Sequence, residues 1–126
     1  MEPKFYICKH CGNIIVYARN AGVAVMCCGE KMQQISANTT DASQEKHVPV
    51  IMQESGRVLV KVGEEPHPMT EQHYIAWICL ATEKGYQFHY LCPEDKPEAH
   101  FMVCEDDKPV AALAYCNLHG LWKAEI

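Results

Sequence analysis

The sequence lacks the features that would tie it to a membrane or to a nucleic acid. No apolar stretch among its 126 residues is long enough to span a bilayer, and no run of basic residues is present. The formal net charge is −5, which excludes an anionic nucleic acid or membrane surface as the expected main partner. The segment MEPKFYICKH has no basic region followed by an apolar core, so we expect no signal peptide and a reducing, cytoplasmic location.

Cysteine, by contrast, is abundant. The chain has eight cysteines, and four of them stand close together as Cys8-x-x-Cys11 and as the adjacent pair Cys27-Cys28. A disulfide framework is typical of small secreted domains. Because no signal peptide is expected and this clustering is typical of metal ligands, we interpret the four thiols as a metal site.

Residues 1–36 are predicted to form a small module that this metal holds together. Short strands are expected at 14–17 and 23–26, and the second leads directly to Cys27. A module of fewer than about 40 residues buries too little core to be stable alone, so four thiolates on one ion would supply the missing stability. Adjacent cysteines bind one ion only if the backbone bends, because successive side chains of a strand diverge. Structural zinc and mononuclear iron both suit four thiolates.

Residues 37–126 are predicted to form a β-sandwich. The polar segment 33–44 indicates a linker, which sets the domain boundary near residue 36. Beyond it, β-rich runs alternate with turn signals at roughly even spacing. These runs predict seven strands, at 48–52, 57–62, 74–80, 86–91, 99–103, 109–115 and 121–126. Alternation in the third strand predicts that His73, Ile75, Trp77 and Cys79 share one face.

A second metal site is indicated in this domain. Cys116 and His119 form a C-x-x-H pair at the end of a predicted strand. Structural zinc normally closes its shell with four ligands, whereas four imidazoles and one thiolate leave a sixth position open, which suits iron that meets a small molecule. Copper electron-transfer sites use only two histidines. Lys46 would add a local positive charge that attracts an anion. The remaining proposed ligands are His47, His67 and His73.

Three segments resemble desulfoferrodoxin, a family of two-iron superoxide reductases. They are EKHVPVI at 45–51, PHPMTEQHYIAWI at 66–78 and AYCNLHGLWKAE at 114–125. The four clustered cysteines match that family's other metal site, the iron centre of a desulforedoxin-like module. The resemblance covers essentially the whole chain, and it implies a mainly β fold in which an immunoglobulin-like sandwich follows the small module.

The resemblance implies that the chain reduces superoxide to hydrogen peroxide by one electron. It assigns one iron to Cys8, Cys11, Cys27 and Cys28, and a catalytic iron to His47, His67, His73, Cys116 and His119. It assigns Glu45 to the sixth position of the ferric site and Lys46 to the attraction of superoxide. It also implies a homodimer, with rubredoxin or a similar small protein as the electron donor.

The other histidines and cysteines match no ligand motif. His89 and His100 are expected to be non-ligands, and Cys79 a buried apolar thiol. Cys92 and Cys104 are either free or paired. Two competing functions are an electron carrier or structural metal protein that turns over no substrate, and a superoxide dismutase, in which superoxide would also reduce the metal.

Overall fold

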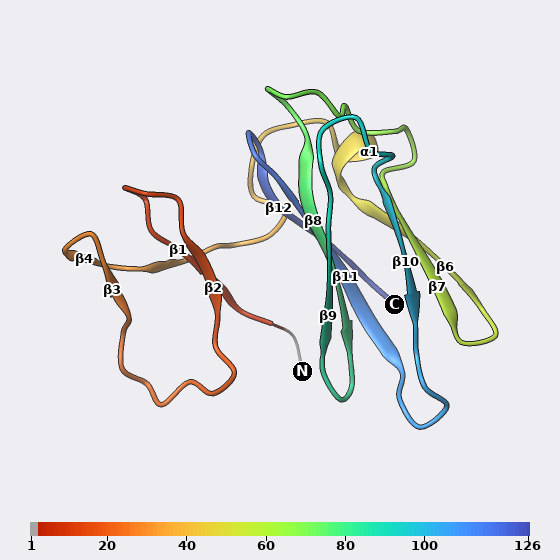
Figure 1. Cartoon of the computed structure of the whole chain (residues 1–126), viewed down its shortest axis with the longest axis horizontal. Helices are drawn as coiled ribbons and strands as arrows, with labels where there is room; N and C mark the ends of the chain where they lie inside the picture. Colours follow the sequence, from red (N-terminus) through yellow and green to blue (C-terminus); the bar gives the residue numbers. More distant parts are fainter. Residues whose placement is uncertain (1–2) are drawn as a thin grey trace. The chain divides into compact units, whose positions relative to one another are not determined.

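The computed structural model describes residues 3–126, which divide into two compact units, Pro3–Ser36 and Ala37–Ile126 (Figure 1). The regular secondary structure of both units is almost entirely β-strand, so the predicted fold class is confirmed. In this described part of the chain, no helix is long and apolar enough to cross a membrane.

The small unit contains five short strands in two sheets. One sheet has the order β2-β1-β5, formed by β1 (Phe5–Ile7), β2 (Ile14–Val16) and β5 (Gln33–Gln34). The other pairs β3 (Met26–Cys27) with β4 (Glu30–Lys31). The predicted strand at 14–17 is therefore present. The one predicted at 23–26 is wrong except at its last residue, because pairing with β4 begins only at Met26.

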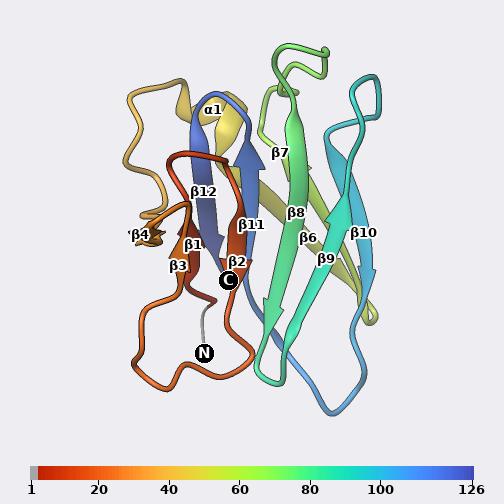
Figure 2. The same cartoon turned by 60° about the vertical axis from the view of Figure 1, so that its left-hand side comes forward.

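The larger unit is a two-layer sandwich of seven strands, as the sequence predicts. One sheet has the order β10-β7-β6 and the other β12-β11-β8-β9, and all neighbours are antiparallel (Figures 1 and 2). The strands are β6 (Pro49–Glu54), β7 (Arg57–Val62), β8 (Ile75–Thr82), β9 (Tyr86–Tyr90), β10 (Glu98–Met102), β11 (Pro109–Cys116) and β12 (Gly120–Glu125).

Apolar side chains from the inner faces of both sheets form the core. Val60 and Val62 contribute from one sheet, and Ile78, Leu80 and Ala112 from the other; all five are fully buried. The alanine-rich run at 111–114 belongs to β11 and is buried.

The prediction that Ile75 shares a face with Trp77 and Cys79 is wrong, although the latter two do share one. Register along β8 pairs Trp77 with Tyr115, but the next pair is Ile75 with Cys116, so the strand has a bulge between these pairs. The bulge reverses the alternation. Ile75 therefore joins the core, and Trp77 stacks on the Tyr115 ring at 5.6 Å outside it.

One helical turn and three loops lie at the same end of the sandwich (Figure 2). The turn is α1 (Gln44–His47), which directly precedes β6 and which the sequence reading did not predict. The β11–β12 turn is tight because Cys116 pairs with Gly120, whose φ of +78° favours glycine. The strands thereby bring distant parts of the sequence to one edge of the unit.

Candidate metal centres

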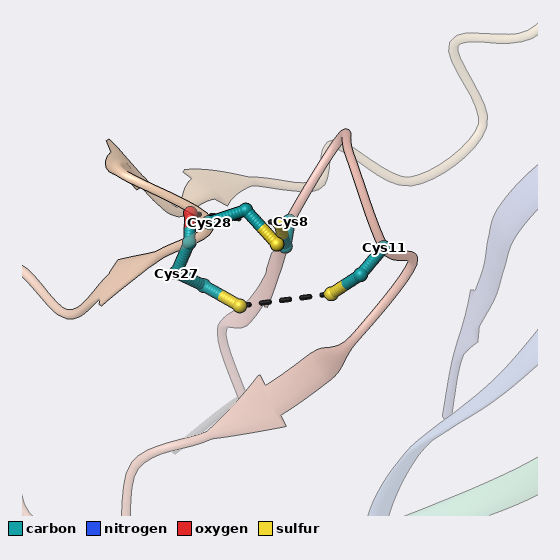
Figure 3. A group of neighbouring side chains, drawn as sticks. All are labelled: Cys8, Cys11, Cys27 and Cys28. Carbon is teal, nitrogen blue, oxygen red and sulfur yellow. Dashed lines mark hydrogen bonds between the residues drawn. The ribbon is translucent and has the colours of Figure 1, made fainter.

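Four cysteine side chains of the small unit point toward one another (Figure 3). Their sulfur atoms all lie within 4.8 Å of one another, and the Sγ atoms of Cys11 and Cys27 are 3.6 Å apart. The first pair is held by a tight turn, in which the Gly12 N–H donates to the Cys8 carbonyl at 2.9 Å. The second pair lies where β3 ends.

The backbone bends at Cys28, as two adjacent ligands require. Cys28 has a φ of +51°, in the left-handed region that costs a residue with a side chain about 1–2 kcal/mol, and Gly29 follows at +78°. The bend turns the Cys28 sulfur to the same side as the Cys27 sulfur. The strained backbone conformation therefore lies at the second of the two adjacent cysteines.

Hydrogen bonds within the four-cysteine group shift the pKa values of two of its thiols in opposite directions. The backbone N–H of Cys11 lowers the pKa of Cys8 to about 6, whereas hydrogen bonding to the Cys11 sulfur raises the pKa of Cys28 to about 12. One thiolate is thus stable here, while a second is disfavoured by its neighbours. A bound cation removes this repulsion, so the group fits a metal ion that prefers four thiolates.

Five other side chains, from separate segments, meet at the end of the sandwich described above. The end of α1 supplies one ligand candidate, and the single loop between β7 and β8 supplies two. The β11–β12 region supplies two. In chain order these side chains are His47, His67, His73, Cys116 and His119.

The four imidazoles form a closed square. Neighbouring ring centroids are 4.6 to 5.0 Å apart, and neighbouring planes are nearly perpendicular, at 78° to 83°. His47 and His73 lie across the square from each other at 6.3 Å. The Nε2 atom of His47 is 3.2 Å from Nε2 of His67 and 3.1 Å from Nδ1 of His119. The ring nitrogens thus converge on a common centre.

Backbone carbonyls hold two of these rings in the tautomer that a metal needs. The Nδ1–H of His47 donates to the Ser43 carbonyl at 2.6 Å, and that of His67 donates to the Pro68 carbonyl at 2.7 Å. Both Nε2 atoms therefore carry lone pairs, which repel each other at 3.2 Å unless a cation lies between them. The Nε2 atom of His73 is buried and has no hydrogen-bond partner. These observations fit a bound metal ion.

Burial favours the neutral form of three of the imidazoles. It lowers the pKa of His47 and His73, and it lowers the pKa of His67 to about 4. Neutral imidazole is the form that binds a metal, so these rings need not release protons near pH 7.

Cys116 lies fully buried beside the square. Its Sγ is 3.9 Å from Nδ1 of His119 and within 4.8 Å of the ligand nitrogens of the other three histidines. Burial raises the pKa of this thiol, while the N–H groups of Leu118 and His119, the latter at 3.4 Å, act in the opposite direction. The N–H of Asn117 donates instead to the Tyr74 carbonyl. The turn thus stabilises a thiolate through two N–H groups.

The side chains of Trp122 and Asn117 support the site through hydrogen bonds that the sequence did not predict. The Trp122 ring packs 4.8 Å from His47, and its Nε1–H donates to the His119 carbonyl at 3.1 Å. The Asn117 side chain accepts from the Tyr74 N–H and donates to the Gln72 carbonyl, each at 2.9 Å. Asn117 therefore ties the His73 loop to the Cys116 turn. Its position directly after a ligand cysteine is a signal that sequence reading could have used.

The remaining histidines and cysteines lie outside both groups. His89 and His100 are exposed, and His100 lies 3.7 Å from a Glu98 carboxylate oxygen. Cys79 is buried, and burial raises the pKa of its thiol to about 12. Cys92 and Cys104 are exposed free thiols, which settles the alternative that the sequence left open.

Known proteins resemble this chain in both sequence and structure. The sequence model of the family described as Desulfoferrodoxin matches residues 39–125. The desulfoferrodoxin of Syntrophotalea carbinolica is 46% identical over 121 residues, covering 95% of this chain and 94% of the relative. The superoxide reductase of Pyrococcus horikoshii is 43% identical over 103 residues, and the match covers 68% of this chain and 90% of the relative. The crystal structure of the superoxide reductase from Treponema pallidum matches with a TM-score of 0.83 and 38% sequence identity. The match covers 99% of this chain and 100% of that chain.

Proposed function

Because the chain belongs to the desulfoferrodoxin family, we propose that it is a superoxide reductase. The reaction adds one electron and two protons to superoxide and releases hydrogen peroxide. The observation that carries the proposal is the square of four imidazoles beside one buried cysteine sulfur. Five ligands leave one position for a small molecule, which a closed structural zinc site lacks.

We propose iron for both centres, one in the four-cysteine group and one in the histidine–cysteine group. Iron would supply the redox change that zinc lacks, and the thiolate of Cys116 would be its electron-donating sulfur ligand. The neutral imidazoles add no negative charge, so a ferrous centre with one thiolate remains positive and attracts an anion. Four histidines exceed the two of a copper electron-transfer site.

Two exposed side chains of α1 are proposed to act on the substrate side. Lys46 is exposed and directly precedes the buried ligand candidate His47, so it would add a local positive charge on the substrate side of a protein whose net charge is −5. Glu45 accepts a hydrogen bond from its own backbone N–H, which lowers the pKa of its carboxyl and keeps it ionised near pH 7. This carboxylate is available to cover the open position once substrate has left.

The first experiment supplies superoxide and reduced rubredoxin to the iron-loaded protein. Relative to a protein-free control, we expect one additional hydrogen peroxide for each rubredoxin oxidised, no additional oxygen evolution, and no accelerated loss of superoxide without the donor. An oxygen electrode and a peroxide assay measure the balance. Oxygen evolved at half the superoxide consumed, without any donor and faster than in the protein-free control, would identify a dismutase instead. Absence of any reaction would favour an electron carrier.

Replacement of Lys46 with alanine tests the steering role. The second-order rate with superoxide should fall about tenfold at low salt, and its dependence on ionic strength should weaken, because a nearby cation accelerates anion encounter. The visible spectrum should not change, since Lys46 is not a ligand. Pulse radiolysis measures the rate. Lys108→Ala, which removes the same charge from the opposite end of the sandwich, is the control. An unchanged rate in Lys46→Ala would reject electrostatic steering.

We further infer a homodimer in a reducing cytoplasm. Large apolar side chains such as Val23 (76% exposed) and Tyr90 (75% exposed) supply surface for a second copy, and all eight cysteines are unpaired. Sedimentation equilibrium checks the first inference, because a mass of one chain at micromolar concentration would exclude a stable dimer. Cell fractionation checks the second.

A further inference from the structure

We propose that Gly63 is a positioning residue, which sets where α1 holds Glu45, Lys46 and His47 relative to His67. Gly63 is buried and directly follows β7, at the point where the β6–β7 ladder ends with the pair Pro49–Val62. Its Cα faces the backbone of α1. A methyl group at this position would lie 2.7 Å from the Glu45 carbonyl oxygen.

The contact involves backbone atoms only. The same methyl group would lie 2.9 Å from the Val48 carbonyl oxygen and 3.1 Å from the Lys46 carbonyl carbon. A side-chain neighbour can rotate away from a clash, but a backbone neighbour moves only when its whole segment moves. Any residue larger than glycine therefore displaces α1, the turn that starts at Gly63, or both.

A hydrogen bond joins the two segments at this contact, because the Glu65 N–H donates to the Glu45 carbonyl at 3.0 Å. A second bond closes the turn itself, in which the His67 N–H donates to the Val62 carbonyl at 2.8 Å. Gly63 thus lies between α1, which ends at His47, and the turn that leads to His67. The Nε2 atoms of these two histidines are 3.2 Å apart. A displacement of either segment by a few tenths of an ångström would therefore change the separation of these two nitrogens appreciably.

The inference rests on the proposed function for the roles of Lys46 and Glu45, while the spacing of the two imidazoles does not depend on it. If Gly63 served stability alone, a substitution would lower the melting temperature and leave the metal centre unchanged. If Gly63 sets the ligand spacing, the substitution changes the centre itself. Spectra and backbone protection distinguish these roles without an activity assay.

The test compares Gly63→Ala with Gly85→Ala. Gly85 lies at the opposite end of the sandwich, in the β8–β9 turn, and a methyl group there would meet no atom within 4 Å. In Gly63→Ala we expect a shifted visible thiolate-to-iron band, at least roughly tenfold slower reduction of superoxide, and faster amide exchange at Glu65 in the metal-free protein. Gly85→Ala should match the wild type in all three. A Gly63→Ala protein with wild-type spectrum, rate and exchange would overturn the inference, whatever its melting temperature.

If Gly63→Ala does not fold, a second pair of variants tests whether the contact between α1 and the turn after β7 sets the ligand spacing. Glu65→Pro removes the N–H that donates to the Glu45 carbonyl but leaves Gly63 in place, and Glu65→Ala removes only an exposed side chain. We expect the band to shift in Glu65→Pro and to stay in Glu65→Ala. Equal spectra in the two would overturn the inference. If the wild type binds iron but does not reduce superoxide, the proposed function fails, and the spectral comparison still tests Gly63.

Discussion

Replacing Cys116 with serine should remove the visible thiolate-to-iron band and slow superoxide reduction by at least about 100-fold. The band requires a sulfur ligand, and a hydroxyl is a poorer electron donor than a thiolate. Serine is close to cysteine in size, and the N–H groups of Leu118 and His119 that face the sulfur can still donate to an oxygen. The fold should therefore survive. The measurements are the spectrum after mild oxidation and the second-order rate by pulse radiolysis.

Cys79→Ser is the matched control for this change. Cys79 is as fully buried as Cys116, so the loss of an apolar sulfur in the interior is comparable, but it lies outside both metal groups. We expect Cys79→Ser to lose stability and to keep both the band and the rate. A Cys116→Ser protein that retains the band would show that this sulfur is not an iron ligand.

Removal of the metal from the four-cysteine group should unfold Pro3–Ser36 within the full chain, while the sandwich stays folded. The strands of this unit are two or three residues long, and its only buried large apolar side chains, among the described residues, are Phe5 and Met32. A four-thiolate site in such a small unit contributes on the order of 10 kcal/mol to folding. Hydrogen exchange read by mass spectrometry, before and after a chelator, measures the loss of protection.

Two cysteine variants separate metal loss from a general effect of the chelator. Cys27→Ser removes one sulfur of the group and should unfold the small unit without chelator. Cys92→Ser removes an exposed thiol outside it and should leave exchange unchanged. Full protection of the small unit in the absence of metal would show that its own packing stabilises it and would contradict the prediction.

Several local features could not be derived from the sequence pattern. The helical turn α1 has only four residues, too few for a recognisable helical period, so the sequence pattern predicted no helix after the polar linker at 33–44. The bulge in β8 shifts one residue in a strand whose alternation is otherwise regular, and only pairing with β11 reveals it. The strand expected at 23–26 fails because pairing with β4 starts only at its last residue.

The amino-acid sequence by itself determined the fold class, the seven strands of the sandwich and the residues that gather in the two metal groups. Hydrophobic alternation, turn residues and the chemistry of thiols and imidazoles are local properties, readable without coordinates. The tertiary structure alone decided the square of imidazoles, the carbonyls that set the tautomers of His47 and His67, and the contact of Gly63 with α1. Those features join segments distant in the sequence, and their distances depend on how the whole sandwich packs.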